Sequence, residues 1–267
     1  MSDALLEVEG YTGAFRSAAG QMSPVLHDVS FRLRAGAITA VVGETGSGKS
    51  LVALSILGLQ PPAFVRGAGR ILFRGADLLA LDEPALRRIR GARISMVFQD
   101  ARAALNPVFT VGRQLADVHR LHHGGSRSAA MRQAIEALRR VHIPEPGRRS
   151  RQYPHEFSGG MAQRAMIAMA AMTCEPELLI LDEPTTGLDV TIQSEIMELI
   201  VELTRSRGLT TCLITHDLGV VAQTCDEMVV MNAGRVVETG GTEAIFTAPR
   251  DRYTRRLIAA SELAPAA

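Results

Sequence analysis

The chain has 267 residues and a formal net charge of +1 at neutral pH, so its overall charge gives no reason to expect binding to nucleic acid or to an anionic membrane surface. Hydrophobic residues make up 46% of the sequence and charged residues 21%, which excludes an intrinsically disordered chain. The longest apolar runs, 51–59 and 165–174, are about half the roughly 20 residues that a membrane-spanning helix needs.

The amino-terminal segment MSDALLEVEG is acidic and has no basic stretch, so a secretory signal is not expected. Three cysteines, Cys174, Cys212 and Cys225, show no paired spacing. We therefore expect small buried thiols in a reducing compartment, without disulfides or a cysteine metal site. These features favour a cytoplasmic protein.

Strand and helix patterns alternate at both ends of the chain. Val29, Phe31 and Leu33 alternate with polar residues, which predicts a half-exposed strand, and the apolar run 37–42 predicts a strand buried on both faces. Further strands are expected at 70–73, 93–98, 177–181 and 210–215, a hairpin around 232–234, and helices at 50–59, 191–205 and 242–248. This alternation predicts an α/β fold with a mostly parallel sheet.

The middle of the chain, from about 101 to 172, has no strand pattern. The residues Met131, Ile135, Leu138 and His142 recur instead at helical spacing. We predict that a helical subdomain, residues 100–172, is inserted into an α/β core formed by 1–99 and 173–267.

A glycine-rich motif follows the apolar run 37–42. Its residues are Gly43, Glu44, Thr45, Gly46, Ser47, Gly48, Lys49 and Ser50, with Leu51 next in the chain. Glycines at this spacing let backbone N–H groups turn inward around phosphate oxygens, and the following helix presents the positive end of its dipole. Lys49, the single lysine of the chain, is expected to reach the β- and γ-phosphates, and the Ser50 hydroxyl to bind Mg²⁺. The motif predicts nucleotide binding, but many different reactions share it.

The tetrapeptide LDEP occurs twice, at Leu81–Pro84 and Leu181–Pro184. The second copy ends an apolar strand pattern, at the edge where open α/β sheets bind ligands. There Asp182 is expected to hold Mg²⁺ through water, and Glu183 to polarise the water that attacks the γ-phosphate. The first copy opens an arginine-rich helical pattern, so Asp82 is predicted to be a helix N-cap with a structural role only.

Four further motifs resemble, in the same order, those of the ATP-binding subunits of ABC transporters. They are VFQD (97–100) for the glutamine loop, FSGGMAQR (157–164) for the signature, TTGLD (185–189) for the D-loop and ITHD (214–217) for the switch-histidine segment. The resemblance extends from about Leu5 to Ala260. It implies an ATPase with a P-loop ABC core, whose mostly parallel sheet is joined by antiparallel amino-terminal strands and interrupted by the helical subdomain.

Ser158, Gly159 and Gly160 stand just before a helical pattern and so predict a second backbone anion site. In the family that the chain resembles, the signature of one subunit covers the nucleotide held by its partner. The resemblance therefore implies a head-to-tail dimer with ATP between the subunits, and Asp189 at the interface. The fifth signature position is Met161 instead of the usual glutamine, and the backbone anion site does not depend on that side chain.

The resemblance also implies roles for residues that would be unremarkable alone. His216 would hold the γ-phosphate and the attacking water, and Gln99 would contact Mg²⁺ and sense the membrane subunit. An aromatic side chain near the amino terminus commonly stacks on adenine in this family; Phe15 is the first choice and Tyr11 the second. The expected cofactors are ATP and Mg²⁺.

Several segments are similar to the oligopeptide, dipeptide and nickel importer branch of the family. They are 99–115, 153–161, 164–172, 182–190, 215–222 and the tail 249–260. The resemblance implies a motor for uptake of peptides, nickel or a related small solute, attached at the cytoplasmic face of the membrane. Its partners would be a second ATPase subunit, two membrane permease subunits and, indirectly, an extracytoplasmic solute-binding protein. Leu51 after the glycine-rich motif favours a heterodimer over a homodimer.

Two alternatives stay open from the sequence. A non-transport ABC ATPase acting on nucleic acid or ribosomes would typically show two cassettes, a long coiled-coil insertion or a basic surface. A phosphotransferase would use the glycine-rich motif but would have no role for the signature or His216. The pair His122-His123 lies in a segment that resembles a Gly/Ser loop, where solvated histidines are expected rather than a nickel site.

Overall fold

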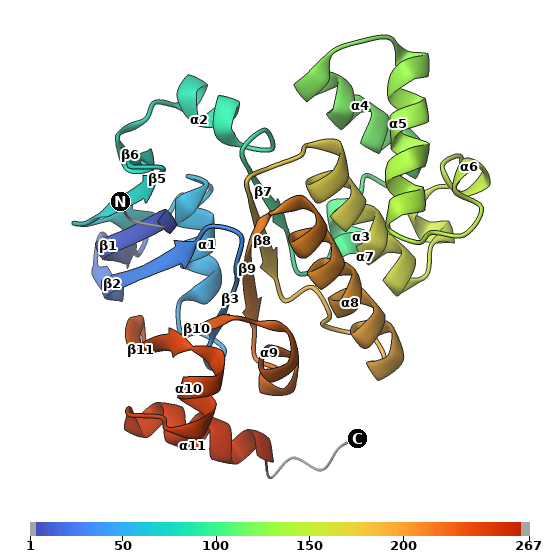
Figure 1. Cartoon of the computed structure of the whole chain (residues 1–267). Coiled ribbons are helices and arrows are strands. Elements are labelled where there is room, and N and C mark those ends of the chain that lie inside the picture. Colours follow the sequence, from blue (N-terminus) through green and yellow to red (C-terminus); the bar gives the residue numbers. More distant parts are fainter. Residues whose placement is uncertain (1–3, 263–267) are drawn as a thin grey trace. The chain divides into compact units, whose positions relative to one another are not determined.

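A computed structural model describes residues 4–262, which form two compact units (Figure 1). Unit 1 consists of two segments of the chain, the residues up to Arg87 and the residues from Thr210 onward. Unit 2 comprises Arg88–Leu209. The core boundaries predicted after residues 99 and 172 stay a prediction, and the first three and last five residues of that core lie outside the described residues. Within 4–262, no helix is both long enough and apolar enough to cross a membrane.

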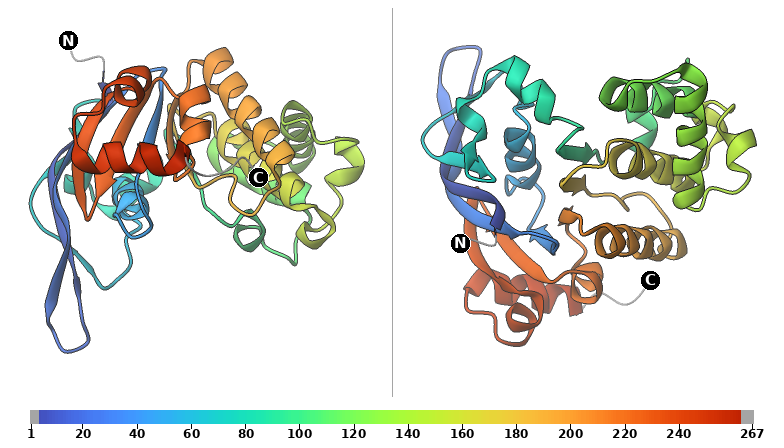
Figure 2. Two further views of the ribbon diagram at one scale, coloured as in Figure 1. Left: turned by 90° about the horizontal axis from the view of Figure 1, so that it is seen from below. Right: turned by 45° about the horizontal axis from the view of Figure 1, so that its top comes forward.

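Unit 1 contains an antiparallel sheet made of β1 (Ala4–Arg16), β2 (Met22–Arg34), β4 (Phe64–Arg66), β5 (Arg70–Phe73) and β6 (Ala76–Asp77). Strands β1 and β2 form a long hairpin (Figure 2). Along β2 the side chains of Val29, Phe31 and Leu33 are buried while the residues between them are exposed. The predicted half-exposed strand is therefore confirmed, and its apolar face belongs to the core of unit 1.

Unit 1 also contains a parallel set of strands, namely β3 (Ile38–Val42), β9 (Thr210–Thr215) and β10 (Glu227–Asn232), extended by β11 (Arg235–Gly241). Strand β3 lies between β9 and β10 and runs parallel to both, and β11 pairs antiparallel with β10. All of β3 is buried, which confirms the prediction for this apolar run. Ala233 and Gly234 have φ +44° and +75°, left-handed values that suit the tight turn of a hairpin.

The helices of unit 1 are α1 (Lys49–Ile56), the start of α2 (Glu83–Ile89), α9 (Leu218–Thr224), α10 (Thr242–Thr247) and α11 (Arg252–Glu262). Helices α9, α10 and α11 pack on the parallel strands through a shared core of Val42, Val221, Val230, Ile245 and Ile258. Asp82 accepts a hydrogen bond from the backbone N–H of Ala85 at 2.9 Å. Its predicted role as the N-cap of α2 is confirmed.

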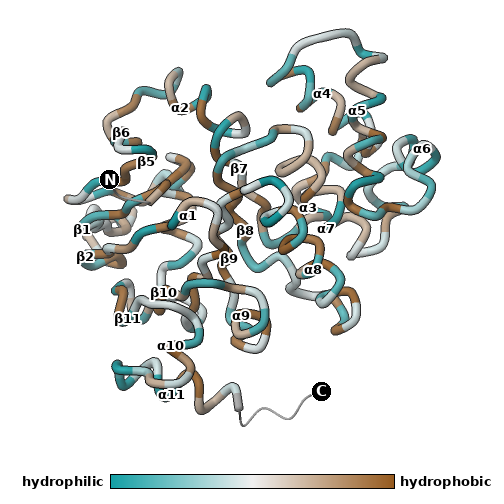
Figure 3. The backbone as a smooth tube through the Cα atoms, viewed as in Figure 1, coloured by the Kyte–Doolittle hydropathy of each residue, from teal (hydrophilic) through white to brown (hydrophobic). Residues whose placement is uncertain are grey.

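Unit 2 combines two parallel strands with a set of helices. Every residue of the strands β7 (Ile94–Val97) and β8 (Leu178–Asp182) is buried, and most of these residues are hydrophobic (Figure 3). The helices are α3 (Ala101–Ala104), α4 (Val111–His123), α5 (Arg127–Arg140), α6 (Pro146–Arg149), α7 (Gly159–Ile167) and α8 (Val190–Arg207). No strand falls between Val97 and Leu178, a stretch that the structure describes in full, as the missing strand pattern predicts.

The buried face of α5 is made of small residues, Ala130, Ala134 and Ala137, together with Leu138. Helix α5 ends at Arg140, so His142 of the predicted pattern lies beyond it, with φ +58°. Small side chains let a helix lie close to its neighbours. The spacing of large apolar residues therefore predicts the helix but not its packing face.

Two of the three thiols, Cys174 and Cys212, are buried as expected, and Cys225 is half-buried. Burial raises the pKa of Cys174 and of Cys225 to about 11. Both groups are therefore protonated at neutral pH, the state of an unreactive structural thiol.

The β10–β11 turn leaves no room for a side chain at Gly234. A Cβ there would lie 2.1 Å from the carbonyl oxygen of Val25. We expect Gly234→Ala to lower the free energy of unfolding by about 3 kcal/mol, measured by thermal and denaturant unfolding. Gly208→Ala is the matched control, because Gly208 also has positive φ (+62°) but open space around its Cβ; it should cost only about 1 kcal/mol. Equal costs would contradict the close approach.

Candidate active site

The glycine-rich segment Gly43–Ser50, here called the phosphate loop, closes around the ammonium group of its own lysine. Lys49 is only 6% exposed. Its Nζ donates hydrogen bonds to the carbonyl oxygens of Gly43 (2.7 Å) and Glu44 (2.9 Å) and to the Ser47 hydroxyl (3.3 Å). The lysine therefore sits inside the loop, at the start of α1.

Two glycines of the phosphate loop are required by close contacts. Gly43 has φ +149°, and a Cβ there would lie 2.1 Å from the carbonyl oxygen of Met231; Gly48 has φ +101°, and its Cβ would lie 2.7 Å from the side chain of Leu26. Gly46 has positive φ (+83°) but open space. The loop therefore packs closely against β10 at Gly43 and against β2 at Gly48.

Exposure divides the residues of the phosphate loop. Glu44, Thr45, Gly46 and Ser50 are exposed, Leu51 is half-buried, and Gly43, Ser47 and Lys49 are buried. The backbone N–H of Gly234 donates to the carbonyl oxygen of Ser47 at 3.0 Å. The β10–β11 turn therefore holds the buried side of the loop and leaves the other side open for a ligand.

His216 lies at the same edge of the parallel strands as the phosphate loop. In the pairing of β3 with β9, Val42 is opposite Thr215, so Gly43 and His216 each follow a paired residue on neighbouring strands. His216 is exposed. The next residue, Asp217, caps α9 by accepting the N–H of Val220 at 3.0 Å, which fixes the turn that carries the histidine.

The two aromatic candidates for stacking on adenine differ in exposure. Tyr11 is fully buried, and its hydroxyl has no hydrogen-bond partner among the described residues. Phe15 is half-buried and makes an edge-on contact with Phe64, with ring centroids 5.7 Å apart. Of the two, Phe15 is the ring with a partly exposed surface.

Unit 2 brings three of the predicted residues together. Asp182 ends β8 and is 8% exposed, and Glu183 follows it in a left-handed conformation with φ +47°. The amide of Gln99, in the loop after β7, donates to Oε2 of Glu183 at 3.3 Å. The hydroxyl of Thr186 donates to the same oxygen at 2.9 Å. These two donors orient the carboxylate, and the role of Thr186 is one that the motif match did not single out.

The signature segment forms the N-terminus of α7. The Ser158 hydroxyl accepts the N–H of Met161 at 3.3 Å and so caps the helix. A Cβ at Gly160 would lie 2.6 Å from Cγ2 of Ile192, and one at Gly159 would lie 3.1 Å from Leu188. The glycines therefore let α7 lie close against α8 and the loop before it. The backbone N–H groups of the first turn point out of this N-terminus.

A cavity of about 500 Å³ lies beside the signature, within unit 2. Its walls include Gln99, Gly159, Gln163 and Thr186. The amide nitrogen of Gln163 is buried and has no hydrogen-bond partner among the described residues. Asp189, predicted to lie at a dimer interface, caps α8 by accepting the N–H of Ile192 at 3.0 Å.

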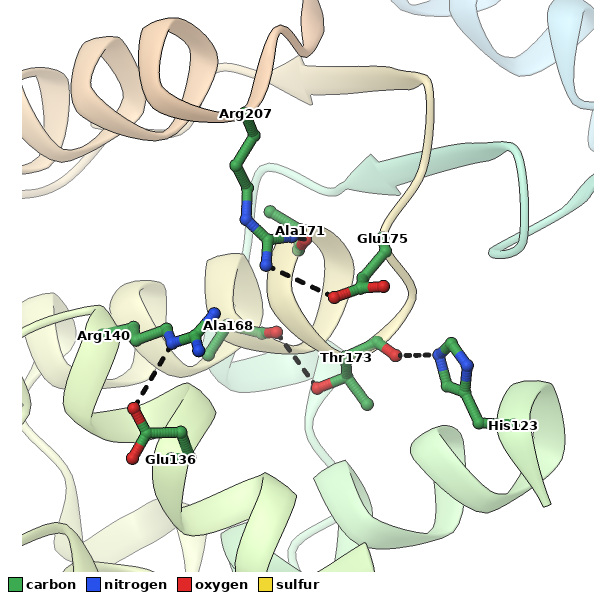
Figure 4. A network of polar contacts seen from close by, with 8 residues as sticks. All are labelled: His123, Glu136, Arg140, Ala168, Ala171, Thr173, Glu175 and Arg207. Carbon is green, nitrogen blue, oxygen red and sulfur yellow. Dashed lines mark hydrogen bonds and ion pairs between the residues drawn. The ribbon is translucent and has the colours of Figure 1, made fainter.

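The far end of α7 is held by polar contacts (Figure 4). The helix continues as a π-helix over Ala168–Thr173. Arg207 of α8 donates to the carbonyl oxygen of Ala171 at 3.1 Å, and the ring of His123 lies 2.9 Å from the carbonyl oxygen of Thr173. Carbonyl groups at a helix end need such donors, so α4 and α8 fix the position of α7.

His122 and His123 form the last turn of α4 rather than the expected loop, because the helix continues up to Gly124, which has φ +71°. His122 packs against Gly91, and burial lowers its pKa. Among residues 4–262, no group of three or more His, Cys, Asp or Glu side chains is placed to hold a metal ion.

Comparison with known proteins identifies the family. The model of the ABC transporter family matches residues 26–186. A probable peptide ABC transporter ATP-binding protein of Sinorhizobium fredii is 48% identical, over 96% of this chain and 76% of the relative. The chain belongs to the ABC transporter family.

Two dipeptide transport ATP-binding proteins are similar to this ABC ATPase. The one from Bacillus subtilis is 48% identical over 95% of this chain and 76% of its own length, and the one from Escherichia coli is 47% identical over 87% and 71%. ATP-binding subunits of ABC transporters hydrolyse ATP, so the chain is a nucleotide-binding ATPase.

Solved structures of ABC cassettes share the fold. A dimeric ATP-binding cassette bound to ADP and Pi, MJ0796, is 25% identical with a TM-score of 0.78, covering 89% of this chain and 98% of that chain. The Clostridium perfringens cassette cbiO1, part of an ABC transporter complex, is 29% identical with a TM-score of 0.78 and covers 92% of each chain. The predicted ABC ATPase fold is confirmed.

The contact between Gly160 and Ile192 gives a test of signature packing. We expect Gly160→Ala to lower the free energy of unfolding by about 2 kcal/mol, because the new methyl group overlaps Cγ2 of Ile192. Ile192→Leu removes that methyl group. The double variant should therefore recover about 1 kcal/mol relative to the sum of the single variants. Strict additivity of the two changes in unfolding free energy would contradict the contact.

Proposed function

We propose that this ABC ATPase powers the uptake of peptides through separate membrane permease subunits. The observation that carries the proposal is the 47–48% identity to relatives named as peptide or dipeptide transport proteins, over most of the chain. Nickel and related small solutes belong to the branch that the sequence resembles, and uptake measurements distinguish them. The alternative of an ATPase acting on nucleic acid has no support from a net charge of +1.

The first step in this function is the binding of phosphate groups by the phosphate loop. Lys49 would exchange the carbonyl oxygens of Gly43 and Glu44 for the β- and γ-phosphates of ATP. The amides at the start of α1 would receive phosphate oxygens. Phe15 would stack on the adenine ring.

The residues proposed for the metal have hard oxygen donors, the chemistry that Mg²⁺ prefers. They are the Ser50 hydroxyl, the Gln99 amide oxygen and the Asp182 carboxylate. Bound Mg²⁺ would neutralise charge that develops on the transferred phosphoryl group. Asp182 would act through a water molecule.

Hydrolysis needs a base and a partner that holds the attacking water. Glu183 is proposed as the base that polarises this water. Gln99 and Thr186 support this role because both donate to one oxygen of its carboxylate, which fixes the direction of the group. His216 would hold the water and the γ-phosphate.

The signature residues Ser158, Gly159 and Gly160 would cover the nucleotide of a second ATPase subunit in a head-to-tail dimer, with Asp189 at its interface. A heterodimer is favoured over a homodimer. The ATPase would dock on two membrane permease subunits at the cytoplasmic side of the membrane, with an extracytoplasmic solute-binding protein acting through them. Gln99 would report on the permease.

Substitution of the glutamate in each LDEP copy tests which copy takes part in hydrolysis. We expect Glu183→Gln to retain ATP binding and to lose hydrolysis by about 10²–10⁴-fold, because the amide cannot accept the proton. Steady-state phosphate release and equilibrium ATP binding measure the two effects. Glu83→Gln, in the other copy, is the matched control and should hydrolyse ATP like the unchanged chain. Normal turnover in Glu183→Gln would remove Glu183 from the role of base.

Uptake in cells tests the transport function. Deletion of the gene should abolish uptake of a labelled dipeptide, and the unchanged chain should restore it while the Glu183→Gln variant does not. Co-purification from native membranes should recover permease subunits and a second ATPase. Loss of nickel uptake with intact dipeptide uptake would contradict the proposed solute.

A further inference from the structure

The carboxyl-terminal helix of unit 1 reaches the phosphate loop. The hydroxyl oxygen of Tyr253, in the first turn of α11, accepts a hydrogen bond from the backbone N–H of Glu44 at 3.0 Å. The two residues are 209 positions apart in the chain. An acceptor from the tail thus satisfies a backbone donor at the beginning of the loop.

The start of α11 is itself firmly held. The carboxylate of Glu238, on β11, accepts the backbone N–H groups of Arg250 at 2.8 Å and Asp251 at 3.1 Å. Asp251 in turn accepts the N–H of Tyr253 at 2.7 Å and so caps the helix. The backbone that carries the tyrosine is therefore tied to a strand of the sheet.

Apolar packing also holds Tyr253 near the phosphate loop. Tyr253 and Leu257 lie against the core that contains Val42, the last residue of β3, and Ile258 of α11. Val42 directly precedes the phosphate loop. The tail therefore shares a hydrophobic core with the strand that leads into the loop, and the Tyr253 hydroxyl contacts the loop itself.

Glu44 is held differently on its two sides. Its carbonyl oxygen accepts hydrogen bonds from Lys49 Nζ at 2.9 Å and from the N–H of Ser47 at 3.1 Å. Phosphate binding by Lys49 would weaken the first of these contacts. The hydrogen bond from Glu44 N–H to Tyr253 does not involve the ammonium group, so that exchange does not require it to break.

We propose that Tyr253 is a positioning residue for nucleotide binding: its hydroxyl holds the Glu44 end of the phosphate loop while Lys49 turns to the phosphates. This role, which rests on the proposed function of Gly43–Ser50, gives the carboxyl-terminal helix a direct part in ATP affinity. Because the hydroxyl accepts a hydrogen bond from the backbone of the phosphate loop and is neither the proposed base nor a proposed metal ligand, we expect its loss to weaken ATP binding and to leave the chemical step unchanged.

Tyr253→Phe in the full chain is the test, because it removes the hydroxyl and keeps the ring. We expect the KM for ATP and the dissociation constant for ATP each to rise about fivefold, the effect of one lost hydrogen bond. The kcat should change by less than about twofold, and the Tm by less than about 4 °C. ATPase kinetics, calorimetric ATP titration and thermal unfolding measure these quantities.

Ser261→Ala is the matched control, because it removes another hydroxyl from α11, one that donates to the carbonyl oxygen of Ile258 at 2.7 Å. It should bind ATP like the unchanged chain. An unchanged ATP affinity in Tyr253→Phe, an equal loss in Ser261→Ala, or unfolding of Tyr253→Phe would each overturn the proposal.

ATP binding by Lys49→Ala is measured in the same experiment. It distinguishes a wrong role for Tyr253 from a wrong assignment of Gly43–Ser50 as the phosphate-binding loop. If Lys49→Ala loses ATP binding while Tyr253→Phe binds normally, the loop function stands and the positioning role falls. If Lys49→Ala binds ATP normally, both fall together.

Discussion

The nucleotide site depends on a backbone loop that must close tightly around one ammonium group. Lys49 draws the carbonyl oxygens of Gly43 and Glu44 toward it, and a segment without strand or helix pairing keeps such a shape only when neighbours hold it. The carbonyl group of Met231 lies where a side chain at Gly43 would be, and Gly234 donates to the far side of the loop. A hairpin almost two hundred residues away is therefore part of the phosphate site.

Local signals in the sequence were enough to predict the elements that carry the site. The apolar run before Gly43 predicts a doubly covered strand, and Asp82 has the position of a helix cap; both are observed. Parallel pairing of β3 with β9 then places His216, the residue after β9, at the same strand edge as the phosphate loop, a consequence of the topology that strand and helix alternation predicts. These features depend on side-chain periodicity and on hydrogen bonds between residues close in the chain, and both can be predicted from the order of residues in one sequence.

Contacts between distant residues could not be predicted in this way. Two such contacts are hydrogen bonds made by hydroxyl groups, one between Thr186 and the Glu183 carboxylate and one between Tyr253 and the backbone N–H of Glu44. Polar residues carry no periodic signal in the sequence. The alanine face of α5 has the same difficulty, because small residues bury little area and so resemble a surface pattern. Positions of this kind are determined by tertiary packing.

The two LDEP segments show how strongly tertiary packing acts. In one, Glu83 begins a helix; in the other, Glu183 has φ +47°, a left-handed conformation that costs an L-residue about 1–2 kcal/mol. Identical neighbours cannot account for opposite backbone conformations. The two copies differ in their surroundings: at the second, a buried strand delivers Asp182 to the sheet edge, and Gln99 and Thr186 donate hydrogen bonds to the Glu183 carboxylate. The strained backbone of Glu183 and the two hydrogen bonds that orient its carboxylate therefore occur together, at the residue proposed as the base.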